Sequence, residues 1–274
     1  MIESLLEIMS LKFVWMALLV SFLVSIVSGV IGSIAVANKK VFVAGSVAHS
    51  AFGGVGLALF CGFSPTLGAM LFAILLALFL SWANRHYQDR LDSYMGAIWA
   101  FGMALGVVLI DFTPGYNSDI SSYLFGSIIA VSDEEAQAIA VYDAILLCFV
   151  GVYYRQILGF LYDEAFCRVQ GVGTMWLNRI IFVLIAIGVV MSMSVAGLIL
   201  VLAILCIPAY IAQLFVRSLR AMMFVGFVLS LVFMWVGFFL AYWLNISPGA
   251  CIVLLMCVGM LIALGCKYLL QKEV

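Results

Sequence analysis

Charged residues are scarce in this chain. Only 9% of its 274 residues are Asp, Glu, Lys or Arg, whereas 67% are hydrophobic. Soluble globular domains are typically about 45–50% apolar and about 25% charged. A chain of this composition cannot cover itself with a polar surface in water, and no polar stretch is long enough for a separate soluble domain. The composition therefore predicts a single membrane domain over residues 1–274.

Basic residues are few and bring no excess of positive charge. The 12 Lys and Arg residues are balanced by 13 Asp and Glu residues, which leaves a net charge of −1. This excludes the basic surface that nucleic-acid binding requires. The cysteines stand singly, without the paired spacing of a zinc site, and we expect them to be inert core residues. They are Cys61, Cys148, Cys167, Cys206, Cys251, Cys257 and Cys266.

Motifs for covalent chemistry are also missing. The chain has no P-loop, the glycine-rich sequence that binds nucleotide phosphates, so we expect it not to hydrolyse ATP by itself. No pair of catalytic groups falls within an apolar stretch, which argues against an intramembrane enzyme. We expect no tightly bound cofactor.

Long apolar runs are present instead, and they divide the chain into membrane spans. A helix needs about 20 apolar residues to cross a hydrocarbon core of roughly 30 Å. This criterion predicts an all-α, polytopic integral membrane protein with eight to nine transmembrane helices. The candidate spans are Phe13–Val36, Val41–Phe60, Ser64–Trp82, Tyr94–Ile110, Ala136–Tyr154, Ile180–Val195, Gly197–Gln213, Met222–Trp243 and Ala250–Cys266. A shorter apolar piece, Ile120–Val131, is predicted to be interfacial or re-entrant.

The positions of the basic residues predict the orientation of the spans, because cytoplasmic loops carry an excess of Lys and Arg. Nine alternating spans place eleven of the twelve Lys and Arg residues on one face, with only Lys12 opposite. The other face receives CGFSPT, the acidic DFTPGYNSD and the neutral NISPG. The N-terminus is then outside and the C-terminus is cytoplasmic.

Glycines recur at close spacings in the second and fourth spans. They are Gly53, Gly54, Gly56, Gly102 and Gly106. Small residues let helix backbones approach closely within lipid, so these glycines predict helix packing.

Two ionisable residues fall within predicted spans, where such groups are either paired or functional. His49 offers an imidazole nitrogen as a ligand for a metal ion, with Ser46 and Ser50 nearby on the same helix. It could equally be a histidine satisfied by a carbonyl of a neighbouring helix. Asp143 could bind a cation or relay a proton, or it could be held protonated or hydrogen-bonded to a neighbour.

The longest polar stretch on the predicted inner face is Arg155–Arg179, which contains GFLYDEAFCRVQGVG. Its centre predicts a short amphipathic helix that ends at Gly171. Apolar Phe160, Leu161, Phe166 and Val169 alternate there with Asp163, Glu164 and Arg168. Such a helix lies on a membrane surface or docks into a groove of another protein, although it could also simply join two spans.

Five motifs, in order, resemble those of the membrane permease subunits of ABC importers for zinc, manganese or iron. The family's GDAxSHAxxPGxAxG-like stretch corresponds to KKVFVAGSVAHSAFGGVGLAL, and its outer DxxSYLFGS motif to Asp119–Ser127. Its cytoplasmic DEEFARxxGV motif corresponds to Asp163–Val172. The two remaining matches are GLILVLAILCIPAYIA from Gly197 and AYWLNISPGACIVL from Ala241.

The resemblance implies an ABC importer permease that forms a homodimer around a central metal path in the inner (plasma) membrane. Cytoplasmic ATPase subunits would dock on a coupling segment at about residues 156–171, and an extracytoplasmic solute-binding protein would deliver the ion. The implied coupling residues are Tyr162, Asp163, Glu164, Phe166 and Arg168.

The chain departs from the family at one important position. The family has an Asp four residues before the motif histidine, and this chain has Gly45 there. Only His49 carries over as a ligand, and we hypothesise that two copies face each other across the dimer axis, with Ser46 or backbone oxygens completing the shell.

These observations favour a permease subunit that imports a divalent transition-metal ion by alternating access while partner subunits hydrolyse ATP. One alternative is an ABC permease for a metal chelate, such as a siderophore or cobalamin, which would need a wider and more polar path. A second is an ion-coupled secondary transporter with Asp143 as its relay, although such proteins tend to show repeated halves with interrupted helices.

Overall fold

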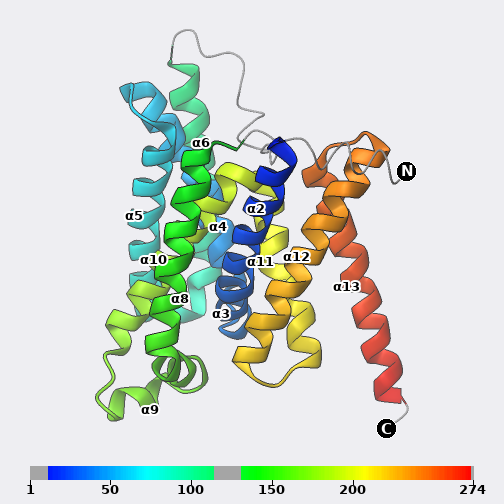
Figure 1. Cartoon of the computed structure of the whole chain (residues 1–274). Coiled ribbons are helices and arrows are strands. Elements are labelled where there is room, and N and C mark those ends of the chain that lie inside the picture. Colours follow the sequence, from blue (N-terminus) through cyan, green and yellow to red (C-terminus); the bar gives the residue numbers. More distant parts are fainter. Residues whose placement is uncertain (1–11, 114–130, 273–274) are drawn as a thin grey trace. The chain divides into compact units, whose positions relative to one another are not determined.

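The computed structural model describes residues 12–113 and 131–272, and within these ranges the chain is helical and has no strands. The long helices are α2 (Lys12–Val27), α4 (Val41–Cys61), α5 (Pro65–His86), α6 (Leu91–Asp111), α8 (Asp133–Tyr162), α10 (Thr174–Ala196), α11 (Leu198–Phe215), α12 (Leu219–Leu244) and α13 (Pro248–Lys272). Short elements are the π-helix η1 (Ser28–Gly32), α3 (Ser33–Ala37), the 3-10 helix η2 (Gln88–Arg90) and α9 (Glu164–Val169) (Figure 1).

The all-α membrane fold is confirmed. The described residues include nine helical stretches long and apolar enough to cross a membrane, the first of which runs through α2, η1 and α3. Each overlaps one predicted span. The predicted re-entrant piece Ile120–Val131 and the outer motif Asp119–Ser127 lie, apart from Val131, outside the described residues.

The fifth span differs most from its predicted bounds. The span was predicted to end at Tyr154, but α8 continues to Tyr162. Ile157 and Phe160 are buried on the extension. One apolar face of the helix therefore stays packed against the protein beyond the end of the predicted span. Arg179 likewise lies inside α10, so the inner polar stretch is largely helical.

The chain divides into two compact units. Unit 1 comprises Met1–Ser33, Ser122–Ile145 and Met191–Val274, and unit 2 comprises Ile34–Ser121 and Leu146–Val190. The helices α8 and α10 contribute residues to both units. The single permease domain remains a prediction.

In unit 2, α4 packs directly on the backbones of α5 and α6. A Cβ added at Gly54 would lie 2.3 Å from the carbonyl oxygen of Gly68, and one added at Gly56 would lie 2.6 Å from that of Gly106. No side chain larger than hydrogen fits at such distances. The packing role predicted for the glycines of α4 is therefore confirmed. This close contact sets the position of α4, the helix that carries His49, against α5 and α6.

In unit 1, α11 contains a proline whose missing N–H is compensated from another helix. Pro208 cannot donate to the carbonyl of Ile204, one turn earlier in α11. The hydroxyl of Ser28, at the first position of the π-helix η1, donates a hydrogen bond to that carbonyl. Since an unpaired backbone group in a membrane is costly, this contact lets α11 keep its proline within a span.

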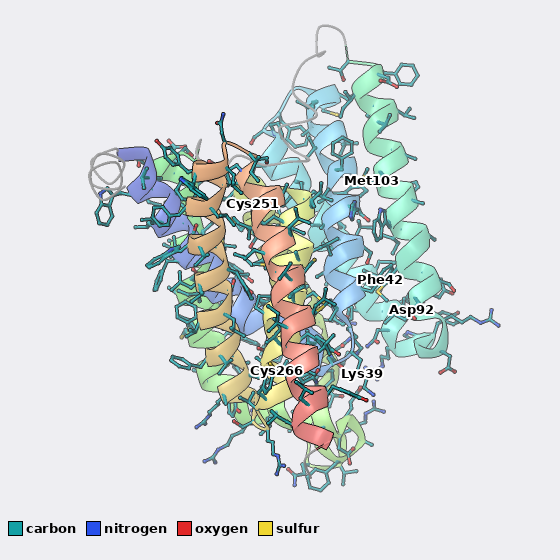
Figure 2. All side chains as sticks on the ribbon, turned by 90° about the vertical axis from the view of Figure 1, so that its right-hand side faces the viewer. Lys39, Phe42, Asp92, Met103, Cys251 and Cys266 are labelled. Carbon is teal, nitrogen blue, oxygen red and sulfur yellow. The ribbon has the colours of Figure 1, made fainter. Side chains whose placement is uncertain are left out.

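The cysteines are free, as expected, but not all belong to the core. Cys167 and Cys251 are buried, whereas Cys61, Cys148 and Cys266 are exposed on the helix surfaces. Cys251 and Cys266 lie near opposite ends of α13 (Figure 2). The prediction of core positions was wrong for the exposed three, because an apolar run in a membrane protein faces lipid as well as the interior.

Candidate functional site

His49 lies on α4 with its ring stacked on Trp99 of α6. The ring centroids are 4.0 Å apart and the planes are tilted by 15°. The imidazole is half-buried, and its Nδ1 has no hydrogen-bond partner among the described residues. The stack fixes the plane of the ring, and the buried Nδ1 is not used by any described group, which makes it a candidate metal ligand.

Ser46 and Gly45 precede His49 by about one helical turn. The Ser46 hydroxyl donates to the carbonyls of Phe42 at 2.9 Å and Val43 at 3.2 Å, which leaves its oxygen lone pairs as the part able to face a cation. Gly45 is buried and brings no side chain. Within the described ranges no group of three or more His, Cys, Asp and Glu residues could hold a metal ion. One copy of α4 therefore offers fewer ligands than a transition metal takes.

Asp143 lies on α8 in unit 1, so the structure does not join it to His49 in one described site. Its side chain is 3% exposed, and neither carboxyl oxygen has a hydrogen-bond partner in the part of the chain that is described. An unpartnered carboxyl group in a membrane span is costly and is a candidate functional group for that reason.

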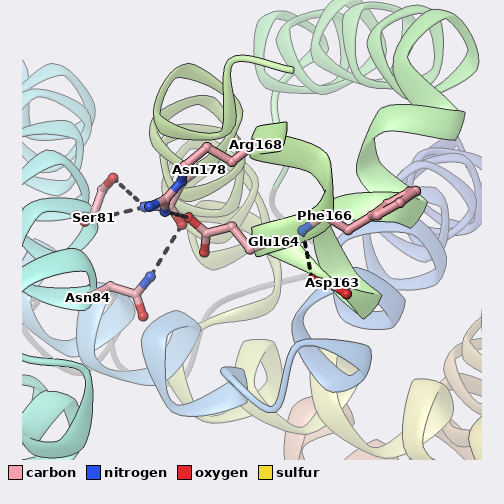
Figure 3. A network of polar contacts seen from close by, with 7 residues as sticks. All are labelled: Ser81, Asn84, Asp163, Glu164, Phe166, Arg168 and Asn178. Carbon is pink, nitrogen blue, oxygen red and sulfur yellow. Dashed lines mark hydrogen bonds and ion pairs between the residues drawn. The ribbon is translucent and has the colours of Figure 1, made fainter. Parts of the chain in front are cut away.

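The short helix α9 has well-defined ends. The carboxylate of Asp163 accepts a hydrogen bond from the N–H of Phe166 at 2.8 Å, which makes Asp163 the N-cap. Glu164 and Arg168 form an ion pair at 2.9 Å along one face of the helix (Figure 3). Gly171 follows with a positive φ of 77°, as expected for a glycine that ends a helix.

The predicted coupling residues, at the end of α8 and on α9, separate into two groups. Tyr162 and Phe166 are 77% and 57% exposed, and the neighbouring Val169 is 88% exposed. Apolar side chains as exposed as these are typical of surfaces that contact a membrane or another protein. Glu164 and Arg168 instead contact each other, and Asp163 serves as the cap. The role of all five in coupling remains a prediction.

Lys40 is a residue that the sequence analysis missed. It immediately precedes α4, and its Nζ lies 5.8 Å from the ring centroid of Phe182 in α10. Burial lowers the pKa of the Lys40 ammonium, and the carboxylate of Glu164 opposes this by raising it. Lys40 thus places a charge between α9 and the start of the helix that carries His49, and its position just before a span was the available signal.

A polar network between α5 and α10 was also missed. The amide of Asn178 donates to the Ser81 hydroxyl at 2.9 Å and to the Ser81 carbonyl at 3.3 Å, and the amide of Asn84 donates to Asn178 Oδ1 at 3.4 Å (Figure 3). Each asparagine directly precedes an arginine, Arg85 or Arg179. These repeated Asn-Arg pairs near helix ends were the signal in the sequence.

The helices define the class of this protein, which is a polytopic α-helical membrane protein. The chain belongs to the ABC 3 transport family, whose model matches residues 10–267. It is therefore the membrane-embedded transport subunit of an ABC system.

Several proteins are similar to this chain over most of its length. The chain is 40% identical to an uncharacterized membrane protein of Synechocystis, covering 97% of this chain and 94% of that one. It is 32% identical to a protein of Chlamydia trachomatis named probable metal transport system membrane protein, covering 88% of this chain and 84% of the relative. It is 28% identical to the manganese transport system membrane protein MntC of Listeria monocytogenes, covering 90% and 88%.

A solved structure has the same fold. PsaBC from Streptococcus pneumoniae, in complex with a Fab, matches with a TM-score of 0.85 and 26% identity, covering 96% of this chain and 95% of that one. The match extends over nearly the whole chain, so the helical arrangement belongs to the family.

Proposed function

We propose that this chain is the permease subunit of an ABC importer that carries a divalent transition-metal ion, with manganese, iron and zinc as the candidate cargoes. The observation that carries the proposal is the family match over residues 10–267, joined to relatives named for metal and manganese transport. The imidazole of His49 suits such ions, since a neutral ring nitrogen is a borderline ligand.

The metal path is built around His49 in two copies of the chain. One copy supplies a single imidazole, a Ser46 hydroxyl and backbone oxygens, which is too few ligands for a closed metal site. A homodimer doubles this set without any further residue. A path with few ligands also suits transport, because the ion must leave the site as easily as it enters.

The permease works with partners on both sides of the membrane. The distribution of Lys and Arg supports an inner-membrane orientation with the α9 end in the cytoplasm. ATPase subunits dock on the exposed apolar side chains of Tyr162, at the end of α8, and of Phe166 and Val169 on α9. A solute-binding protein delivers the ion on the opposite side, and closure of the ATPases moves α9 and, through Glu164 and Lys40, the start of α4.

Metal uptake in cells that lack the chain tests the cargo. Manganese, iron and zinc are each supplied at limiting concentration, with the chain restored or withheld. We expect selective loss of the uptake of one ion, which returns with the chain and requires ATP. Unchanged uptake of all three ions would exclude free-ion import, whereas loss of a chelated form alone would favour a chelate permease.

Replacing Phe166 by alanine is expected to weaken binding of the ATPase subunits. An anchoring aromatic side chain at an interface contributes 2 kcal/mol or more, so we expect about 30-fold weaker binding and a matching loss of uptake. The measurement is co-purification of the ATPase subunits with the permease. Val152→Ala is the matched control, because Val152 is 70% exposed but lies on α8, within a span. Equal binding by the two variants would remove Phe166 from the interface.

A further inference from the structure

A polar cavity lies beside α9, apart from both His49 and the exposed docking face. It has a volume of about 350 Å³ and belongs entirely to unit 2. Its walls come from the end of α5, from α9 and from the first turns of α10 (Figure 3). The polar residues that line it include Asn84, Arg85, Glu164, Arg168, Asn178 and Arg179. The size is at the lower end of small-molecule sites, which run from about 300 to 1,000 Å³.

The cavity carries an excess of positive charge. Arg85, Arg168 and Arg179 line it together with a single acid, Glu164. Glu164 is engaged by Arg168 at 2.9 Å, while Arg85 and Arg179 have no acidic partner among the described residues. The first turn of α10, which begins at Thr174, adds the positive end of a helix dipole. Two guanidinium groups and a helix end thus favour an anion, and guanidinium is the group that best fits phosphate.

One buried polar atom in the wall also lacks a partner. Asn84 is 6% exposed, and its Oδ1 receives no hydrogen bond within the described ranges. Its amide nitrogen is already used toward Asn178. A phosphate oxygen cannot satisfy this acceptor, because neither atom carries a hydrogen. The ligand that completes the site therefore carries a hydrogen-bond donor as well as an anionic phosphate. Because the lining already has an excess of positive charge, an uncharged hydroxyl fits this role better than an ammonium group.

An aromatic cluster places the cavity at the level of the membrane interface. The rings of Trp82 and His86 lie 5.1 Å apart, those of Trp82 and Tyr87 5.7 Å apart, and those of Tyr87 and Tyr94 5.6 Å apart. Tryptophan and tyrosine gather where a membrane protein meets the lipid headgroups. Trp82 and His86 themselves line the cavity, so its mouth lies beside that layer.

We propose that this cavity binds a phosphate ester with a free hydroxyl group, of the kind carried by a glycerol-phosphate headgroup. Arg85 and Arg179 bind the phosphate, and Asn84 Oδ1 accepts from the hydroxyl. The bound group joins the end of α5 to α10 beside the Glu164–Arg168 pair, and so holds α9 in position. This site goes beyond the transport function proposed above and does not depend on the identity of the cargo.

Lipid binding to the purified full chain tests the site. Native mass spectrometry in detergent would compare phosphatidylglycerol with the zwitterionic phosphatidylcholine and with phosphatidylethanol, which is anionic but has no headgroup hydroxyl. We expect the strongest binding for phosphatidylglycerol. The double variant Arg85→Gln, Arg179→Gln should bind it about 25-fold more weakly, at about fivefold for each charge removed near an anionic headgroup. Arg85→Lys, Arg179→Lys keeps both charges and should bind more tightly than the Gln pair.

Arg217→Gln is the matched control, since this exposed arginine lies outside the cavity on the predicted inner face. Inorganic phosphate and glycerol 3-phosphate, titrated as competitors, separate the sources: displacement by them at micromolar concentration indicates a soluble ligand, and resistance indicates the lipid. Equal lipid binding by the Gln pair and Arg217→Gln would overturn the site. Equal affinity for phosphatidylglycerol and phosphatidylethanol would overturn the role of Asn84. The salt dependence of binding to the unaltered chain provides a test that needs no variant, because a site built on two guanidinium groups weakens as salt rises.

Discussion

The substitution His49→Ala is expected to reduce metal uptake to the level of cells that lack the chain. The chain has two histidines, and His49 is the one near the middle of a span, whereas His86 is the last residue of α5. With Gly45 in place of a carboxylate, no second strong ligand stands on the same turn of α4. In the homodimer that we propose, removing the imidazole therefore removes the proposed main ligand from both copies. Uptake of the cargo ion, measured at limiting concentration, gives the result.

The variant His49→Phe separates the proposed role of His49 as a metal ligand from its role in packing. The ring of His49 stacks on Trp99, and an aromatic pair of this kind contributes about 0.5–1.5 kcal/mol to stability. His49→Phe keeps an aromatic ring against Trp99 but brings no nitrogen, so we expect it to transport no better than alanine. Leu57→Ala is the control, because Leu57 lies on α4 and is exposed. Normal uptake by His49→Phe would show that the histidine only packs.

The sequence was sufficient for the spans but not for the ends of every helix. Hydropathy reports where a helix meets lipid, so the apolar stretches could be located from the sequence. Their orientation across the membrane remains a prediction from the basic residues. It does not report where a helix stops. Arg155 and Gln156 interrupt the hydropathy of α8, yet the helix continues because Ile157 and Phe160 still present a buried face.

The site could be predicted only where one residue carries the signal. His49 stands out as an ionisable group in an apolar span. The stack on Trp99 depends on the register between α4 and α6, which no local pattern contains. The cavity beside α9 joins residues from α5 and α10 that are nearly a hundred positions apart, as in the hydrogen bond of Asn178 to Ser81 across 97 positions. Such a site follows from the packing of distant helices, which no local sequence pattern contains.

The substitution Gly54→Val is expected to prevent unit 2 from folding correctly. The added Cβ would lie 2.3 Å from the carbonyl oxygen of Gly68 and 2.6 Å from Cβ of Phe72. The first of these atoms belongs to the backbone of α5, so it cannot move aside as the end of a flexible side chain can. Overpacking typically costs about 1–3 kcal/mol, and the rigidity of this contact places Gly54→Val at or above the upper end. We expect loss of the monodisperse protein in gel filtration and a lower melting temperature.

Gly96→Val isolates this packing effect from the change of residue type. Gly96 lies on α6 with nothing within 4 Å of an added Cβ, so the same substitution alters the same backbone freedom without a clash. Gly54→Ala should fall between the two, because it adds the clashing Cβ without the branch. If Gly54→Val and Gly96→Val melted at the same temperature, α4 and α5 would not approach as closely as Gly54 and Gly68 require. The position of His49 would then have to be set by contacts other than the backbone crossing of these helices, since α4 carries both residues.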